Sequence, residues 1–375
     1  MTQPRSTLTM GVEEEFYLVD DSGELVHEAA GTIDDADEEA GRDAEVDLKG
    51  ELLRSQVESG TAVCRDHGAL LADLTDLRAR LGEAAGHRGA RLLSSGTVVN
   101  EPTDPQRIAA GRRYRRIARH IGRFVVDAAT CGCHVHVGVD SREIAIQVSN
   151  QLRPWLPALL ALSANSPFHH GVDTGYASAR HLLWGRWPTS GPPPYLESEE
   201  HYERIVRGLL ESGAALDRGM IYWDIRPSEH QPTVEIRVAD AHGTEAESTL
   251  FGVLVRTLVA EALDRIDHGV PAERVPHEVL RANLWRAARD GLEGTCADPV
   301  TGEHRPVHDI LAGLAPRCVG GPGEVEFVAA MLDTLRDAGG GAARQRATFG
   351  RRGCLRDVVD MLVEQTAGTS TIKPP

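Results

Sequence analysis

Four segments in the first 240 residues alternate apolar and polar side chains with a period of two. They are GVEEEF at 11–16, LLRSQVES at 52–59, CGCHVHVGVD at 131–140 and TVEIRV at 233–238. Successive side chains of an extended chain point to opposite faces, so this alternation predicts β-strands with one apolar and one polar face each. The fold must therefore bury the apolar face of a sheet and leave the polar face to solvent or to a function.

The polar faces of these segments are rich in carboxylates and imidazoles. They carry Glu13 and Glu15, then Arg54, Gln56 and Glu58, then His134 and His136, and last Glu235 and Arg237, with Glu51 just outside the second segment and out of phase. A solvated face would explain any one strand, but solvent-facing strand positions are usually Thr, Lys, Ser or Gln. Because crowded carboxylates repel one another, the four segments together predict a cation among them.

Glutamate oxygens with an imidazole match the ligand preferences of Mg²⁺ or Mn²⁺ better than those of zinc. Magnesium commonly bridges carboxylates to substrate phosphates, so a nucleoside triphosphate is the expected partner. The chain contains neither a G-x-x-x-x-G-K-[ST] loop nor a G-x-G-x-x-G turn after a strand, which argues against P-loop and Rossmann sites. We therefore expect metal and arginine to hold the phosphates.

Composition excludes several other classes of partner. The 375 residues carry a formal charge of −16, which argues against nucleic-acid binding. No apolar run approaches the roughly 20 residues that span a bilayer, and the N-terminal residues lack a signal-peptide pattern. We expect a cytoplasmic protein without membrane contact that acts on small molecules.

The pattern predicts alternating strands and helices up to residue 244 and helices only after it. Expected strands lie at 8–19, 52–64, 91–99 and 131–140, with two more within 221–240. Expected helices lie at 66–88, 105–124, 142–163 (kinked or divided by Pro154 and Pro157), 201–212, 245–268, 277–290, 322–337 and 341–365. The acidic stretch 34–47 is expected to be a solvated loop or helix face, and the irregular, aromatic-rich segment 163–195 an active-site loop.

Five motifs occur in order along the chain: GVEEEF, GCHVHVG at 132–138, SANSPF with DTG and SAR at 163–180, YWDIRPS at 222–228 and TVEIRVAD at 233–240. Together they resemble the type 2 glutamate–cysteine ligase family, and within it the short carboxylate–amine ligase branch. The resemblance implies an α+β fold of the glutamine synthetase type, in which a curved antiparallel β-sheet forms a funnel covered by helices. It also implies a catalytic core at 1–245 and a helical C-terminal region at 246–375, packed together as one compact domain.

The resemblance assigns roles to the polar faces. The implied metal ligands are Glu13, Glu15, Glu51, Glu58, His134 and Glu235. His136 and Arg226 would approach the nucleotide phosphates, and Arg237 the transferred phosphoryl group. Expected cofactors are ATP and Mg²⁺ or Mn²⁺.

The implied reaction is ATP-dependent amide formation. A substrate carboxylate attacks the γ-phosphate to give an acyl phosphate, and an amine then displaces phosphate, while metal and arginine neutralise negative charge. The catalytic candidates are Glu235 and Arg237, with Arg180 for the carboxylate of the acid and Asp224 to deprotonate or orient the amine. Arg180 and Arg226 could equally be structural salt-bridge partners. Trp184, Trp187 and Tyr195 could wall the pocket, although core packing is the more common role for any one of them.

The substrates are less defined than the chemistry. Glutamate and cysteine, giving γ-glutamylcysteine, are the default. One alternative is a ligase that joins glutamate or another amino acid to a different amine, and a second is a nucleotide- or metal-binding protein without catalysis, which the complete set of charged residues disfavours. Exposed edges of a curved sheet favour a homo-oligomer.

Overall fold

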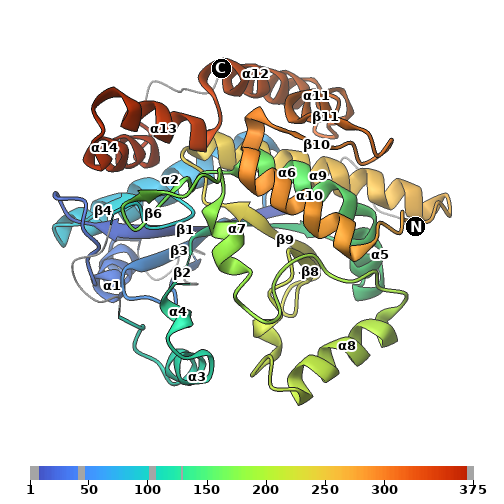
Figure 1. Ribbon diagram of the computed structural model, residues 1–375, viewed down its shortest axis with the longest axis horizontal. Coiled ribbons are helices and arrows are strands. Elements are labelled where there is room, and N and C mark those ends of the chain that lie inside the picture. Colours follow the sequence, from blue (N-terminus) through green and yellow to red (C-terminus); the bar gives the residue numbers. More distant parts are fainter. Residues whose placement is uncertain (1–7, 41–46, 101–106, 128–129, 370–375) are drawn as a thin grey trace.

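A seven-stranded sheet is the centre of the computed structural model, which describes residues 8–40, 47–100, 107–127 and 130–369 (Figure 1). Every pair of neighbouring strands in it is antiparallel, in the order β2-β3-β1-β5-β9-β8, with β4 also pairing with β1. The strands are β1 (Met10–Val19), β2 (Asp47–Gly50), β3 (Gln56–Gly60), β4 (Arg91–Leu93), β5 (Gly132–Gly138), β8 (Ile225–Pro227) and β9 (Thr233–Asp240). The sheet confirms the predicted α+β class.

Helices lie on both sides of this sheet (Figure 1). They are α1 (Ala29–Ala40), α2 (His67–His87), α3 (Arg112–Ile121), α4 (Phe124–Asp127), α5 (Arg142–Leu152), α6 (Leu156–Ser163), α7 (Ala179–Trp184), α8 (Glu199–Glu211), α9 (Glu245–Asp267), α10 (His277–Asp290), α11 (Val307–Ala312), α12 (Pro322–Ala338), α13 (Gly341–Arg352) and α14 (Leu355–Thr366). Two short hairpins complete the fold, β6 (Phe168–His169) with β7 (Val172–Asp173) and β10 (Thr295–Ala297) with β11 (His304–Pro306). In Figure 1, α9, α10 and α12 lie above the sheet, and α3, α4 and α8 lie below it.

The apolar face of the sheet forms the main core. Val12, Val135, Val137 and Ile236 are buried in one hydrophobic cluster with residues of α2, α5, α6, α9, α10 and α12. The alternation predicted each of these four positions to be apolar. The polar side chains between them therefore point to the other face of the sheet. None of the helices within the described residues is long and apolar enough to cross a membrane.

Several predicted elements are shorter or divided in the structure. The strand expected at 91–99 ends at Leu93, because the side chains of Ser94, Ser95 and Thr97 donate hydrogen bonds to backbone carbonyls of distant segments instead of extending the ladder. The strand expected at 52–64 pairs regularly only over β3, since residues 51–55 turn the chain back from β2.

The helix predictions need similar corrections. The helix expected at 105–124 is α3 followed by α4, with Gly122 (φ 74°) at the break, and positions 105 and 106 lie outside the described residues. The helix expected at 142–163 is divided near Pro154, as predicted. Gly353, in the left-handed conformation, divides the helix expected at 341–365. The first part of the acidic stretch 34–47 belongs to α1, and 41–46 are not described.

One charged residue of β1 points into the main core rather than away from it. Glu14 pairs with Arg78 of α2 at 2.6 Å, and both side chains are buried. Arg78 also donates to the backbone carbonyls of His242 and Gly243, just before α9. This ion pair therefore joins β1, α2 and the start of α9 behind the polar face of the sheet.

We expect Arg78→Met to lower the free energy of unfolding by about 3–5 kcal/mol, because it leaves the Glu14 carboxylate buried with a hydrogen bond from Ser248 but without its charged partner. Arg80→Met on the same helix is the matched control, since Arg80 pairs with Asp76 at the surface and should change stability by less than about 1 kcal/mol. Urea unfolding of both variants measures the difference, and equal losses would contradict the structural role of the buried pair.

Candidate active site

The register of the sheet places the polar side chains of five strands next to one another. Across the strands, Glu15 is opposite Glu58, Glu13 opposite His134, and Glu235 opposite both His136 and Arg226. Opposite residues of an antiparallel pair have Cβ atoms about 5 Å apart, so these side chains must interact. The structure thereby brings together the residues that the sequence alternation had placed on separate strands.

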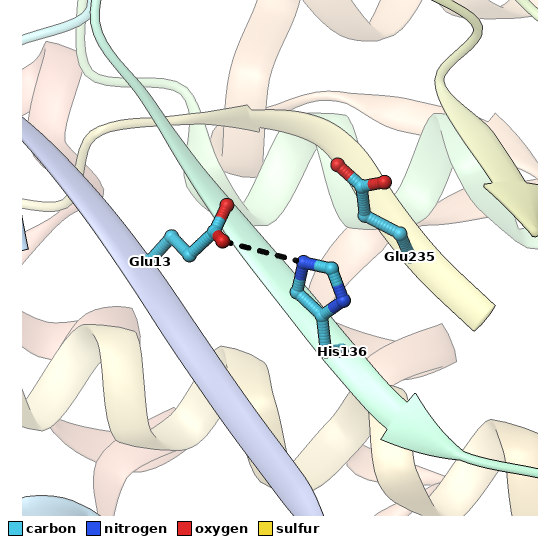
Figure 2. Close-up of side chains that lie close together, drawn as sticks. All are labelled: Glu13, His136 and Glu235. Atoms are coloured by element: carbon cyan, nitrogen blue, oxygen red, sulfur yellow. Dashed lines mark ion pairs between the residues drawn. The ribbon is translucent and has the colours of Figure 1, made fainter. Parts of the chain in front are cut away.

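Glu13, His136 and Glu235 form the first group that could hold a metal ion (Figure 2). One ligand atom from each lies within 4.8 Å of the others, and His136 Nε2 is 3.7 Å from Glu13 Oε1. The other ring nitrogen, Nδ1, lies 2.9 Å from Thr233 Oγ1 and fixes the ring orientation. Nε2 is buried without a hydrogen-bond partner, which is the condition expected of a nitrogen that ligates an ion.

Glu15, Glu51 and Glu58 form the second group, with ligand oxygens again within 4.8 Å of one another. Burial, reinforced by the charge of Glu51, raises the pKa of Glu15 to about 8. Burial and the charges of Glu51 and Glu13 hold the pKa of Glu58 well above its ordinary value. Three acidic side chains that lie this close together and offer only oxygen ligands fit Mg²⁺ or Mn²⁺. Glu51, out of phase in the sequence, joins the group because it lies in the turn between β2 and β3.

His134 lies between the two groups. Its Nδ1 is 3.3 Å from Glu13 and its Nε2 is 3.9 Å from Glu15. Burial and the neighbouring Arg237 lower the pKa of His134 to about 4, so the ring is neutral at physiological pH. The structure therefore places His136, which was predicted to approach phosphates, in a group with two carboxylates. His134, which was predicted to be a metal ligand, lies beside that group.

Two arginines flank Glu235. Arg226 Nε contacts one Glu235 oxygen at 2.7 Å, and Arg237 pairs with the other. Burial alone would raise the pKa of Glu235, but Arg237 and Arg226 outweigh it and hold the pKa below its ordinary range. Glu235 is therefore ionised, and the two guanidinium groups lie beside the first group of possible metal ligands.

Arg180 reaches the same face from the irregular segment. Its buried guanidinium donates to the backbone carbonyls of Val238 and Arg237 at 3.4 Å and lies over the ring of Trp184. A side chain at Gly132 would collide with this guanidinium, so the glycine of GCHVHVG makes room for it.

Three residues that the sequence analysis missed anchor the segment carrying Arg180. Ser166 and Ser178 donate hydrogen bonds of 2.6 and 2.7 Å to the two carboxylate oxygens of Asp240, at the end of β9. The serines are part of SANSPF and SAR, but the motifs alone do not say what the hydroxyl groups bind. The buried Asp240 joins both motifs to the sheet.

Asp224 lies beside the arginines rather than in open space. Burial raises the pKa of Asp224 to about 7, an effect that Arg180 and Arg237 reduce, and its Oδ2 has no hydrogen-bond partner. The residue is buried before β8 and is not among those that line the neighbouring pocket.

A pocket of about 140 Å³ opens beside the second group. Its lining consists of Glu15, Glu51, Leu52, Gln56, Arg113, Tyr114, Ile117, Thr130, Trp184, Trp187, Gly219, Tyr222 and Arg237. Trp184 and Trp187 line it as expected, whereas Tyr195 lies in a different groove, against Arg274. Tyr222, which contacts both tryptophans, was not predicted.

Known proteins resemble the chain over nearly its whole length. The model of the protein family described as Glutamate-cysteine ligase family 2 (GCS2) matches residues 9–361. A protein of Rhodococcus jostii (strain RHA1) named "Putative glutamate--cysteine ligase 2-1" is 47% identical, covering 97% of this chain and 98% of that protein. "Putative glutamate--cysteine ligase 2-2" of Mycobacterium sp. (strain KMS) is 44% identical, with coverage of 96% and 98%.

Two solved structures share the fold. Glutamate–cysteine ligase from Francisella tularensis in complex with AMP has a TM-score of 0.65 at 13% identity, covering 98% of this chain and 90% of that one. A bifunctional glutathione synthetase from Pasteurella multocida has a TM-score of 0.69 at 14% identity, covering 97% of this chain and 52% of that one. At these identities the likeness extends to the fold alone.

We expect Mg²⁺ to raise the melting temperature of the wild-type protein, and Glu58→Gln to reduce that rise. Without metal the same variant should melt higher than the wild type, because it removes one of three crowded carboxylates. A ligand at one hundred times its dissociation constant stabilises a protein by about 2.7 kcal/mol, which sets the scale of the effect. Differential scanning fluorimetry with and without Mg²⁺ measures both changes in melting temperature. Glu211→Gln, at an exposed position of α8, is the control. An unchanged Mg²⁺ response in Glu58→Gln would refute a metal site here.

The raised pKa of Asp224 predicts a pH-dependent stability. An acid whose pKa is higher in the folded than in the unfolded protein contributes stability at low pH that is lost as the pH rises through about 7. Between pH 5.5 and pH 8, Asp224 should lower the free energy of unfolding of the wild type by about 2 kcal/mol. The Asp224→Asn variant lacks this loss, so its free energy of unfolding should rise by that amount relative to the wild type. Urea unfolding at both pH values, with exposed Asp140→Asn as control, tests this; a difference that does not depend on pH would contradict it.

Proposed function

The chain belongs to the glutamate–cysteine ligase family 2, whose members are ATP-dependent ligases, and we propose that it joins glutamate to L-cysteine through an acyl phosphate. The observation that carries the proposal is that two groups of possible metal ligands lie on one face of the sheet, with Arg226 and Arg237 beside them. That arrangement suits a reaction in which two anions, a nucleotide and a carboxylate, must approach each other. The structure of a glutamate–cysteine ligase in complex with AMP supports an adenine nucleotide as the energy source.

Both groups of acidic residues fit hard divalent cations. We assign Glu13, His136 and Glu235 to one ion and Glu15, Glu51 and Glu58 to another, with His134 close enough to ligate either. Bound there, Mg²⁺ or Mn²⁺ would neutralise charge on the phosphate oxygens.

The arginines would hold the anionic substrates. We place the transferred phosphoryl group against Arg237 and the remaining phosphates against Arg226, because a guanidinium fork suits phosphate oxygens. Arg180 would take a carboxylate of the acid substrate from the buried side of the pocket. Asp224 would act through Arg180 and Arg237, whose charges it balances, as a positioning residue.

In this scheme the bonds change in two steps. A carboxylate oxygen of glutamate attacks the γ-phosphorus of ATP, and ADP leaves. The amine then attacks the acyl carbon, loses a proton to solvent, and expels phosphate, which leaves the amide. The pocket lined by Trp184, Trp187 and Tyr222 would receive the amine and limit the access of water.

We expect ATP, Mg²⁺ and glutamate to give ADP and phosphate with L-cysteine, and γ-glutamylcysteine by mass spectrometry. Hydroxylamine, a small uncharged amine, should trap the acyl phosphate as a hydroxamate whatever the natural amine is. Arg237→Gln should lower kcat by about 10²–10³-fold, since it removes a charge that would face the transferred phosphoryl group. Arg204→Gln on the exposed side of α8 is the control.

Each outcome of this assay has a distinct meaning. Turnover with another amine but not with cysteine would keep the ligase and replace its acceptor. ATP binding without hydroxamate formation would contradict catalysis with glutamate.

A further inference from the structure

Helix α3 has two faces of opposite character. One face, made of Tyr114, Ile117, Ala118 and Ile121, packs into the hydrophobic cluster below the sheet. The other is exposed and consists of four arginines at spacings of three and four residues: Arg112, Arg115, Arg116 and Arg119, the α3 arginine face. Residues at these spacings lie on one side of a helix, so the four charges form a single stripe about 10 Å long.

This stripe is unfavourable for the isolated helix. Like charges three or four residues apart destabilise a helix, and cations in the first turn oppose the helix dipole. Within the described residues, none of the four arginines forms an ion pair, although the protein has a net charge of −16. Their neighbour Arg113, by contrast, makes two hydrogen bonds of 3.1 Å to Asp217.

The α3 arginine face lines a hollow that shares two lining residues with the pocket beside the acidic groups. The hollow has a volume of about 570 Å³ and is lined by the four arginines with Arg113, Ile117, Leu216 and Asp217. Arg113 and Ile117 line the inner pocket as well. A molecule that extends from the inner pocket past Arg113 and Ile117 would reach the α3 arginine face.

We infer that the α3 arginine face binds an anionic group, carboxylate or phosphate, that the amine substrate carries at a distance from its amine. The acid substrate must meet the nucleotide first, so it takes the inner position near the acidic groups, and the amine enters from the outer side where α3 lies. Arginine is suited to this role because its planar guanidinium binds both oxyanions in pairs of hydrogen bonds. The inference rests on the proposed carboxylate–amine ligation, and it makes the acceptor an amine with a second anionic group in place of cysteine, whose carboxylate lies on the carbon that bears its amine.

The test uses matched pairs of amines on the full chain with Mg²⁺ and a non-hydrolysable ATP analogue. The pairs are O-phospho-L-serine with L-serine, and L-aspartate with L-asparagine, and isothermal titration calorimetry gives each dissociation constant. The charged member of at least one pair should bind more tightly to the wild type, and the double variant Arg112→Gln/Arg116→Gln should weaken that binding about tenfold. Whether the phosphate or the carboxylate pair shows the effect identifies the anion.

The matched control is Arg204→Gln/Arg207→Gln, which removes two exposed arginines three residues apart on α8, outside both pockets. Its binding constants should stay within about twofold of the wild type, as for other exposed charges. Equal binding of charged and neutral members, no binding of either charged probe, or equal losses in the two double variants would overturn the inference. Hydroxamate formation on the same preparation is scored separately, so a failed anion site and a failed ligase give different results.

Discussion

The crowding of carboxylates on one buried sheet face is the constraint on which the rest of the site depends. In a poorly solvated environment, like charges a few ångströms apart repel strongly, and either protons or cations must compensate them. The two groups meet this constraint differently. The neighbouring imidazoles of His134 and His136 outweigh burial and hold the pKa of Glu13 low, whereas burial raises the pKa of Glu15 to about 8. The first group is thus largely balanced by the protein's own residues, and the second is the one that most needs an external cation.

Contacts on the opposite face of the sheet hold the strands that carry the crowded carboxylates in position. Glu14 alternates with Glu13 and Glu15, so the same strand that supplies two site carboxylates is fixed from behind by the Glu14–Arg78 pair. At the far end of β9, Asp240 holds the serines that position Arg180. The site is therefore assembled on rigid elements, and buried hydrogen bonds determine where its charges lie.

The sequence predicts most of the fold and which side chains share the polar face of the sheet, but not how these residues are paired. Alternation of period two identifies the strands because burial of one face imposes it, and it correctly placed Glu13, Glu15, Glu58, His134 and His136 on the polar face. It could not place Glu51, whose position depends on a turn. Nor could it say which histidine meets Glu235, because that depends on the register of β5 against β9.

Elements governed by local chemistry were likewise predictable only in part. Prolines divided one helix where expected. Gly353 ended another helix through its left-handed backbone conformation, and side-chain hydrogen bonds to distant segments ended β4. Hydrophobic periodicity reports neither of these causes. Tyr195 was a candidate for the pocket wall because it belongs to the aromatic-rich segment 163–195. Its place in another groove shows that an aromatic-rich segment need not direct all its rings to one site.

Positive charge is concentrated at and near the candidate site, although the net charge of the protein is negative. A protein with a net charge of −16 repels anions on average, yet the proposed nucleotide and acid are both anions. Within the described residues, Arg180, Arg226 and Arg237 lie at the acidic groups, and the α3 arginine face lies at the outer edge of the adjoining hollow. Positive charge is thus placed both where anions would enter and where they would react. Because the outer arginines are exposed, salt should screen their attraction strongly, whereas the buried inner arginines keep theirs. Under the proposed function, entry and chemistry would therefore depend on two sets of arginines that respond differently to ionic strength.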